Sequence, residues 1–309
     1  MIKRYNFSDF SIQEICNFVG KYAYTFESEF NIKLITGQVS GGRRMGLSGV
    51  RSDNDFDLFF ETNSLSQDEE PPRKIKRILN INQNEIEVEF NFVNFSTLLE
   101  AAKEKFNSDT KNYPTVFYRS DEEKALYDKN TIKHRGERSE YLYTKFHYFI
   151  FNNHYIVFNK EYINIISEMS KYEKLVDALD YYYVRAYGNY NNYLTQDEKI
   201  LVRRYLNCIW QVMSCKWLLE KKSIPPLDFL ELKKAIITDS TLDEQINLLF
   251  RVNKETDADK SEIFTKPNSV INDYIYNELL YQKKAIELTD TTILMSKVID
   301  LTHNNQFFL

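Results

Sequence analysis

Hydrophobic and polar residues alternate along the first third of the chain with two different periods. In residues 11–30, apolar side chains recur every three to four positions, which predicts an amphipathic helix. Residues 32–39 form a short, largely apolar run that predicts a strand. Residues 53–61 and 85–93 alternate acidic or amide side chains with large apolar ones, the period of a half-buried strand. The pattern therefore predicts a mixed α/β region at the start of the chain.

A polar stretch at residues 64–77 separates two of these strands, and its pair of prolines favours a loop. Four basic residues close this stretch: Arg73, Lys74, Lys76 and Arg77. Such a group is typical of a solvated surface that balances neighbouring acids, and the alternative is a basic lining for a nucleotide or RNA groove. After the last strand, Ser96 is predicted to cap a helix that ends near Phe106.

The hydrophobic period becomes helical in the second half of the chain. Helices are predicted over residues 161–187, 196–221, 227–237, 242–252 and 272–300. The segment 146–158 fits either a hairpin or an irregular helix. We therefore expect an α+β protein in which a mixed-sheet domain, residues 1–130, precedes a helical C-terminal domain, residues 131–309.

Composition narrows the function classes. A net charge of -5 and a pI near 5.6 argue against a protein whose whole surface binds nucleic acid, although a local basic site stays open. The chain shows neither a signal-peptide pattern nor 18 consecutive apolar residues, so we expect a cytoplasmic protein without a membrane partner. Cys208 and Cys215 lie seven residues apart, which predicts two buried thiols on one helix face. The four histidines have no metal-ligand spacing.

Glycine is scarce, with 8 in 309 residues, and five of the eight fall within residues 37–49. A glycine turn lets main-chain amides approach a phosphate, and Arg43 beside Gly41 and Gly42 can add charge-assisted hydrogen bonds. This turn precedes a group of alternating aspartates.

Carboxylates two residues apart project side by side from one strand face. Asp53 and Asp55 are such a pair and can share divalent cations. A third acid from the neighbouring predicted strand, Glu87 or Glu89, would complete a carboxylate cage of the kind that two-metal phosphoryl transfer requires. These residues suit nucleotidyl transfer.

Residues 41–55, GGRRMGLSGVRSDND, resemble the motif of the DNA polymerase beta-like nucleotidyltransferase superfamily. More narrowly, they resemble the bacterial predicted nucleotidyltransferases, some of which are associated with RNA ligases, with a signature like GSRAYGLxxxxSDYD. Residues 178–194 and 203–232 are similar to the helical region of that family. The chain departs from the family pattern at Gly42, where the family has Ser, and at Trp210, where it has Arg.

The resemblance implies a set of site residues. Asp53 and Asp55 would bind two Mg²⁺ ions that bridge a nucleoside triphosphate, with ATP the first expectation. In an alternative alignment of the motif, Asp55 and Asp57 are the pair. The implied catalytic residues are Asp53, Asp55, Glu87 and Glu89, and the implied metal ligands are Asp53, Asp55, Asp57 and Glu89. The implied nucleotide-binding residues are Gly41, Gly42, Arg43, Ser52, Arg203 and Lys216.

The leading hypothesis is a Mg²⁺-dependent nucleotidyltransferase that transfers a nucleoside monophosphate to a hydroxyl and releases pyrophosphate. Its acceptor is left open among an RNA end, a protein side chain and a small molecule. Two alternatives are a second-messenger oligonucleotide synthase and a catalytically idle binding or antitoxin-like protein. Six tyrosines could stack on bases, although core packing is the more ordinary interpretation: Tyr181, Tyr182, Tyr183, Tyr187, Tyr190 and Tyr193.

Overall fold

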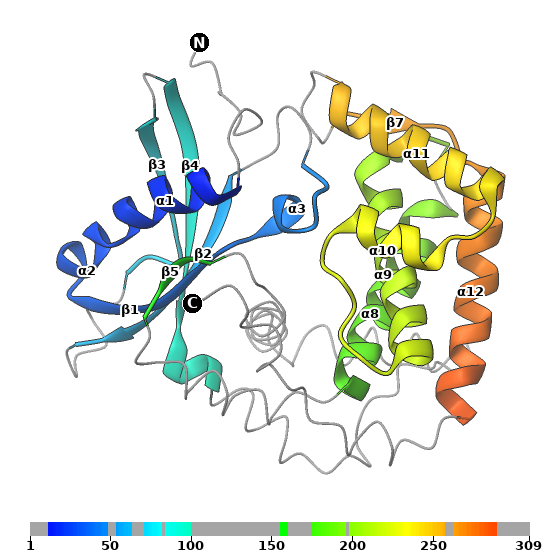
Figure 1. Cartoon of the computed structure of the whole chain (residues 1–309), viewed down its shortest axis with the longest axis horizontal. Helices are drawn as coiled ribbons and strands as arrows, with labels where there is room; N and C mark the ends of the chain where they lie inside the picture. Colours follow the sequence, from blue (N-terminus) through cyan, green and yellow to red (C-terminus); the bar gives the residue numbers. More distant parts are fainter. Residues whose placement is uncertain are drawn as a thin grey trace.

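The computed structural model has an α+β fold, with a mixed sheet followed by a helical region (Figure 1). It describes residues 12–48, 54–63, 71–81, 84–99, 155–159, 175–195, 198–256 and 262–288. The four histidines lie outside the described residues. No helix in these ranges is both long and apolar enough to cross a membrane.

Within the described ranges, five strands form the sheet in the order β3-β4-β2-β1-β5. They are β1 (Ile32–Val39), β2 (Asp55–Thr62), β3 (Lys74–Ile81), β4 (Asn84–Asn94) and β5 (Tyr155–Phe158). Only the β2 and β4 pair is parallel, and the other three pairs are antiparallel. The strands predicted from period-two alternation are confirmed. β5 comes from the segment that the sequence left ambiguous, and it extends the sheet beyond β1.

Strand β3 corrects the prediction of a loop over residues 64–77. From Lys74 onward the chain alternates polar residues with Ile75, Leu79 and Ile81, whose side chains are all buried, and this period pairs it with β4. Residues 64–70 lie outside the described part. The cap of the following helix is also corrected, because the Thr97 amide donates to the Asn94 side chain at 3.2 Å. The predicted continuation to residue 106 lies beyond the described ranges.

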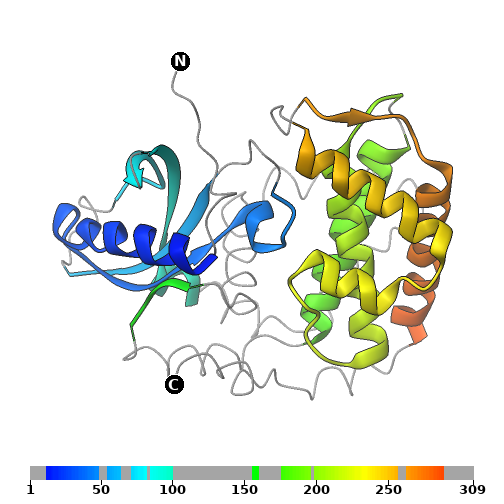
Figure 2. The same cartoon turned by 45° about the horizontal axis from the view of Figure 1, so that its top comes forward.

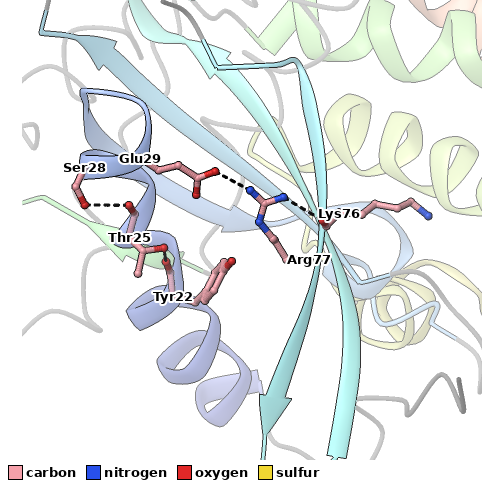
Figure 3. Close-up of polar contacts among 6 residues, drawn as sticks. All are labelled: Tyr22, Thr25, Ser28, Glu29, Lys76 and Arg77. Atoms are coloured by element: carbon pink, nitrogen blue, oxygen red, sulfur yellow. Dashed lines mark hydrogen bonds and ion pairs between the residues drawn. The ribbon is translucent and has the colours of Figure 1, made fainter.

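Helices α1 (Ile12–Ala23) and α2 (Thr25–Glu29) cover one face of the sheet, where a single helix was predicted. The rings that meet there include Phe26 and Phe90, with centroids 5.0 Å apart and nearly perpendicular planes. Figure 3 shows Arg77 of β3 reaching Glu29 of α2 on this side. Aromatic packing and one ion pair therefore hold the helices against the strands.

The helical region is built around α9 (Val202–Lys221), whose side chains are buried on most sides. Around it lie α8 (Leu175–Asn189), a π-helical turn (Tyr190–Leu194), α10 (Phe229–Ile236), α11 (Ser240–Glu255) and α12 (Ser269–Leu288). The short strands β6 (Ile200–Leu201) and β7 (Phe264–Thr265) pair beside it. The helical prediction is confirmed for this region, and Cys208 and Cys215 are both fully buried on α9. Residues 161–174 and 289–300 of the predicted helices lie outside the described ranges.

One hydrophobic cluster joins the sheet to the helices. It contains Ile35, Phe59 and Val93 of the sheet together with side chains of α8 to α12. Figure 2 shows α3 (Gly41–Arg44) between the sheet and the helical region. The chain just after α3 is therefore in position to contact both parts.

Candidate active site

The glycine turn follows β1 and lies directly against an aspartate of β2. Gly41 has φ +65°, a conformation that residues with a side chain rarely adopt. A Cβ atom at this position would lie 2.9 Å from Oδ2 of Asp55. The Ser40 amide also donates to the Asp55 carbonyl at 2.9 Å. Glycine is needed here because the backbone must pass close to a carboxylate.

Strand β2 presents two aspartates on one face of the sheet. Asp55 is paired with Glu89 of the parallel strand β4, and Asp57 is paired with Asn91, so all four side chains project to the same side. Asp57 is buried, and it accepts a hydrogen bond from Asn91 Nδ2 at 3.2 Å. The described structure thus brings Asp55, Asp57 and Glu89 to one face. Asp53 and Ser52 lie outside the described residues.

Both candidate third acids are ion-paired with lysines of β3. Lys74 Nζ lies 2.6 Å from Glu89 Oε1, and Lys76 Nζ lies 2.9 Å from Glu87 Oε1. The lysine side chains are more than half exposed, whereas the Glu89 side chain is only 17% exposed. Two members of the basic group, Lys74 and Lys76, therefore pair with acids of β4, where the sequence suggested neighbouring acids of the loop.

Arg43 lies beside the aspartates in a largely enclosed position. Its guanidinium donates to Asn54 Oδ1 at 2.8 Å, and Asn54 Nδ2 donates to the Glu87 carbonyl at 2.9 Å. Burial lowers the pKa of Arg43 to about 10, and the nearby Asp55 carboxylate opposes that shift. The glycine turn thus carries a cation that burial leaves poorly solvated.

The helical region clamps the chain that follows the turn. The Phe229 amide donates to the Met45 carbonyl at 3.0 Å, and Asn253 Nδ2 donates to the Leu47 carbonyl at 2.8 Å. Gly46 has φ +70°, and a Cβ there would lie 2.7 Å from Oδ2 of Asp228. Residues of α10 and α11 therefore fix the position of the glycine turn.

Lys254 of α11 is a site residue that the sequence interpretation missed. Burial lowers its pKa, the positive charge of Arg43 lowers it further, and Asp228 raises it in opposition. The lysine is a residue of the last turn of an ordinary amphipathic helix, so nothing in the local sequence distinguishes it. Only the packing of α11 against the turn brings it into the field of Arg43.

Several other predicted residues lie in the helical region. Lys216 pairs with Glu278 of α12 at 2.5 Å, and Arg203 lies in the first turn of α9. Trp210 is buried and donates its Nε1 proton to the Leu227 carbonyl at 3.2 Å. Tyr181, Tyr182 and Tyr183 are buried in the cluster that joins the two regions. For these three tyrosines the core-packing interpretation is confirmed.

The donor chemistry of this face suits a hard divalent cation, since carboxylate oxygens are the ligands that Mg²⁺ prefers. Asp55 and Asp57 supply such oxygens from one strand face. Within the described ranges, however, no group of three or more His, Cys, Asp or Glu residues is close enough to hold a metal ion. Magnesium binding therefore stays a prediction.

Comparison with known proteins gives a match to a family model in the second half of the chain. Residues 154–302 match the model of the RlaP family, described as an RNA repair pathway DNA polymerase beta family. No curated protein matches the chain. A solved nucleotidyltransferase-like protein from Exiguobacterium sibiricum 255-15 aligns at 9% identity over 87% of this chain and 74% of that chain, with a TM-score of 0.29. The family match begins beyond the glycine turn and its aspartates, so it is independent of them.

Proposed function

Since the match supports the DNA polymerase beta-like nucleotidyltransferase family for this chain, we propose that the protein is a Mg²⁺-dependent nucleotidyltransferase. It transfers a nucleoside monophosphate from a nucleoside triphosphate, ATP foremost, to a hydroxyl group and releases pyrophosphate. The observation that carries the proposal is the close approach of the Gly41 backbone to Asp55 of β2. Asp55 is paired with Glu89 of the neighbouring strand β4. This arrangement places a glycine turn and an acidic strand face side by side.

The carboxylates hold the metal in this proposal. Asp55 and Asp57 project from one face of β2, toward the side of Glu89 and Asn91, so we adopt the alternative alignment in which these two aspartates are the pair. The metal would neutralise phosphate charge and lower the pKa of the attacking hydroxyl. Asn91 keeps Asp57 oriented through its amide, and Glu89 faces the site from the neighbouring strand.

Two cations next to the turn favour an anionic ligand there. Arg43 is largely enclosed, and burial together with the charge of Arg43 lowers the pKa of Lys254. Two positive groups that repel each other in a partly buried site are stabilised when a negative group binds between them. We assign the triphosphate to this position, with the turn of residues 41–44 against it.

For the acceptor, we propose an RNA end. The support is the description of the matched family, which refers to an RNA repair pathway. Transfer to RNA can also be told apart from transfer to a protein or a small molecule, because the transferred nucleotide then becomes part of a polynucleotide.

The direct test is label transfer from each of the four nucleoside triphosphates to total RNA in the presence of Mg²⁺. Asp55→Asn should reduce the rate by about 10³-fold, since it removes a metal-holding charge and keeps the shape of the side chain. Asp273→Asn, a change at an exposed position of α12, is the matched control and should keep the rate. Unfolding measurements should give similar stabilities for both variants.

Failure of the wild-type protein to bind any nucleoside triphosphate at millimolar Mg²⁺ would overturn the proposal. That result would favour the idle binding protein, for which the structure offers one specific observation. Glu87 and Glu89 are both ion-paired with lysines of β3. An oligonucleotide product formed without acceptor would instead identify a second-messenger synthase.

A further inference from the structure

The polar face of the sheet continues past the acids onto its outer strand. Lys74 and Lys76 of β3 bond to Glu89 and Glu87, so their side chains lie on the same face as Asp55. Ile78, two residues further along β3, is 49% exposed. Its place in the alternation puts Ile78 on that same face. The edge strand therefore presents two cations and one exposed apolar side chain.

Arg77 shows that this placement is specific to alternate residues. It pairs with Glu29 of α2 on the opposite face of the sheet, as Figure 3 shows, while Lys76 points away from that helix. The two neighbours in sequence therefore serve different sides. One holds the covering helix, and the other faces the candidate active site.

Positive groups flank the acids on two sides. Arg43 lies on the β1 side of the acids, in α3, which follows β1. The two lysines lie on the other side, on β3, which is two strands away from β2 in the sheet order. Two strand spacings correspond to about 10 Å, which is the scale of a nucleotide. In a nucleotidyl transfer, the attacking hydroxyl and the departing pyrophosphate lie on opposite sides of the reacting phosphorus. The Arg43 side suits the triphosphate, which leaves the lysine side for the acceptor.

The ion pairs of the lysines are of a kind that exchanges easily. Lys74 and Lys76 are 56% and 57% exposed, and exposed ion pairs contribute little to stability. A phosphate group can therefore replace a glutamate as the partner of either lysine at small cost. A carboxylate released in this way faces Asp55 across the β2 and β4 pair.

We propose that Lys74 and Lys76, with Ile78 beside them, bind the backbone of a single-stranded nucleic acid whose end is the acceptor. The lysines contact successive phosphates, and Ile78 contacts a sugar or base. This inference rests on the proposed function, because it places the acceptor of that reaction. It assigns to the edge strand a binding site for a polyanion.

The test is binding of a fluorescent single-stranded RNA of about 12 nucleotides, a length within the usual site sizes, followed by anisotropy at several salt concentrations. The double variant Lys74→Met and Lys76→Met should bind at least about tenfold more weakly at low salt. The slope of the logarithm of the binding constant against the logarithm of the salt concentration should become shallower by about 1.4, since each lost phosphate contact with a single strand contributes about 0.7. Lys21→Met, which removes an exposed lysine of α1, should change neither quantity.

A second pair of measurements separates this proposal from the function on which it rests. The variant with arginine at both positions should restore the salt dependence, and binding of ATP without RNA should be unchanged in the double methionine variant. Equal RNA affinity and salt dependence in the wild type and the methionine variant would overturn the lysine site. Label transfer only to protein or to a small molecule would also overturn it, while the nucleotidyltransferase proposal would stand. If the wild-type protein transfers no label but binds RNA through the two lysines, the lysine site would stand and the nucleotidyltransferase proposal would be overturned.

Discussion

The two faces of the central sheet are built from the same strands and have opposite properties. On the face covered by α1 and α2, Phe56, Leu58 and Phe90 are fully buried and pack against aromatic rings of the helices. On the other face, the residues between them are Asp55, Asp57 and their partners on β4. Alternation with period two thus separates the residues that stabilise the fold from the residues that we propose for the chemistry.

The polar face is itself divided along the strands. Asp55 and Glu89 are partly exposed, whereas Phe59 and Val93, further along the same strands, belong to the hydrophobic cluster shared with the helices. The acids therefore lie where this face changes from packed to open. A site at such a boundary has rigid support on one side and access for a substrate on the other.

The largest expected effect is a loss of stability when an aromatic ring is removed from the covered face. Phe90→Ala should lower the free energy of unfolding by about 3–5 kcal/mol, because Phe90 is fully buried and contacts the rings of Phe26 and Tyr22. Urea denaturation measures this change. Phe90→Leu, which keeps most of the apolar volume, should cost about half as much or less. A cost below 1 kcal/mol for the alanine variant would mean that the aromatic cluster does not support the sheet.

Most strands of this sheet were predictable because two of them alternate polar and apolar side chains along the sequence. β2 and β4 carry that alternation, whereas β1 was predicted from its short, largely apolar run. The resemblance seen at the glycine turn is accompanied by a match of residues 154–302 to the model of a DNA polymerase beta family. β3 was missed because a proline pair and a dense basic group precede Ile78, which breaks the alternation by being exposed. The two-proline signal was real, but it marks the start of the strand.

The helix boundaries and the site contacts depend on tertiary packing to different degrees. Helical periods located α9, α10, α11, the end of α8 and the start of α12 to within several residues, because each helix has an apolar side in the shared cluster. The other ends of the two remaining predictions lie outside the described ranges. In contrast, the ion pairs of Lys74 and Lys76 depend on strand pairing, which no local pattern specifies. Lys254 was missed for the same reason, since α3 and α11 are about 210 residues apart in sequence and meet only through packing.

An intermediate effect is expected at the polar face, where triphosphate affinity should depend on pH. Burial, and after it the charge of Arg43, lowers the pKa of Lys254, so this ammonium loses its proton below pH 10.5, the ordinary lysine value. Triphosphate affinity should therefore fall as the pH rises toward that value. Lys254→Met should weaken binding about tenfold at neutral pH, since it removes one charge-assisted contact. Lys254→Arg should keep the affinity and remove the pH dependence.

The lowered pKa of Lys254 also determines how the free energy of unfolding changes with pH. The pKa of Lys254 is lower in the folded than in the unfolded protein, so the unfolded state binds more protons between the two values. The free energy of unfolding should consequently rise with pH in that interval, and it should do so less in Lys254→Met. Titration of nucleotide binding by calorimetry, with denaturation at the same pH values, checks both effects. Identical pH profiles for wild type and Lys254→Met would exclude Lys254 from the site.

The smallest expected effect compares two neighbours on β3 that face opposite sides. Arg77→Met should lower the free energy of unfolding by about 0.5–1 kcal/mol, because it removes the ion pair with Glu29 and the contact of the guanidinium with the Phe26 ring at 5.7 Å. RNA affinity should stay unchanged, since this side chain is on the covered face. Lys76→Met should do the reverse, with weaker RNA binding and stability within about 0.5 kcal/mol of the wild type. Denaturation and anisotropy on both variants measure the difference, and equal losses of RNA affinity would show that charge alone matters and that the face of the sheet does not.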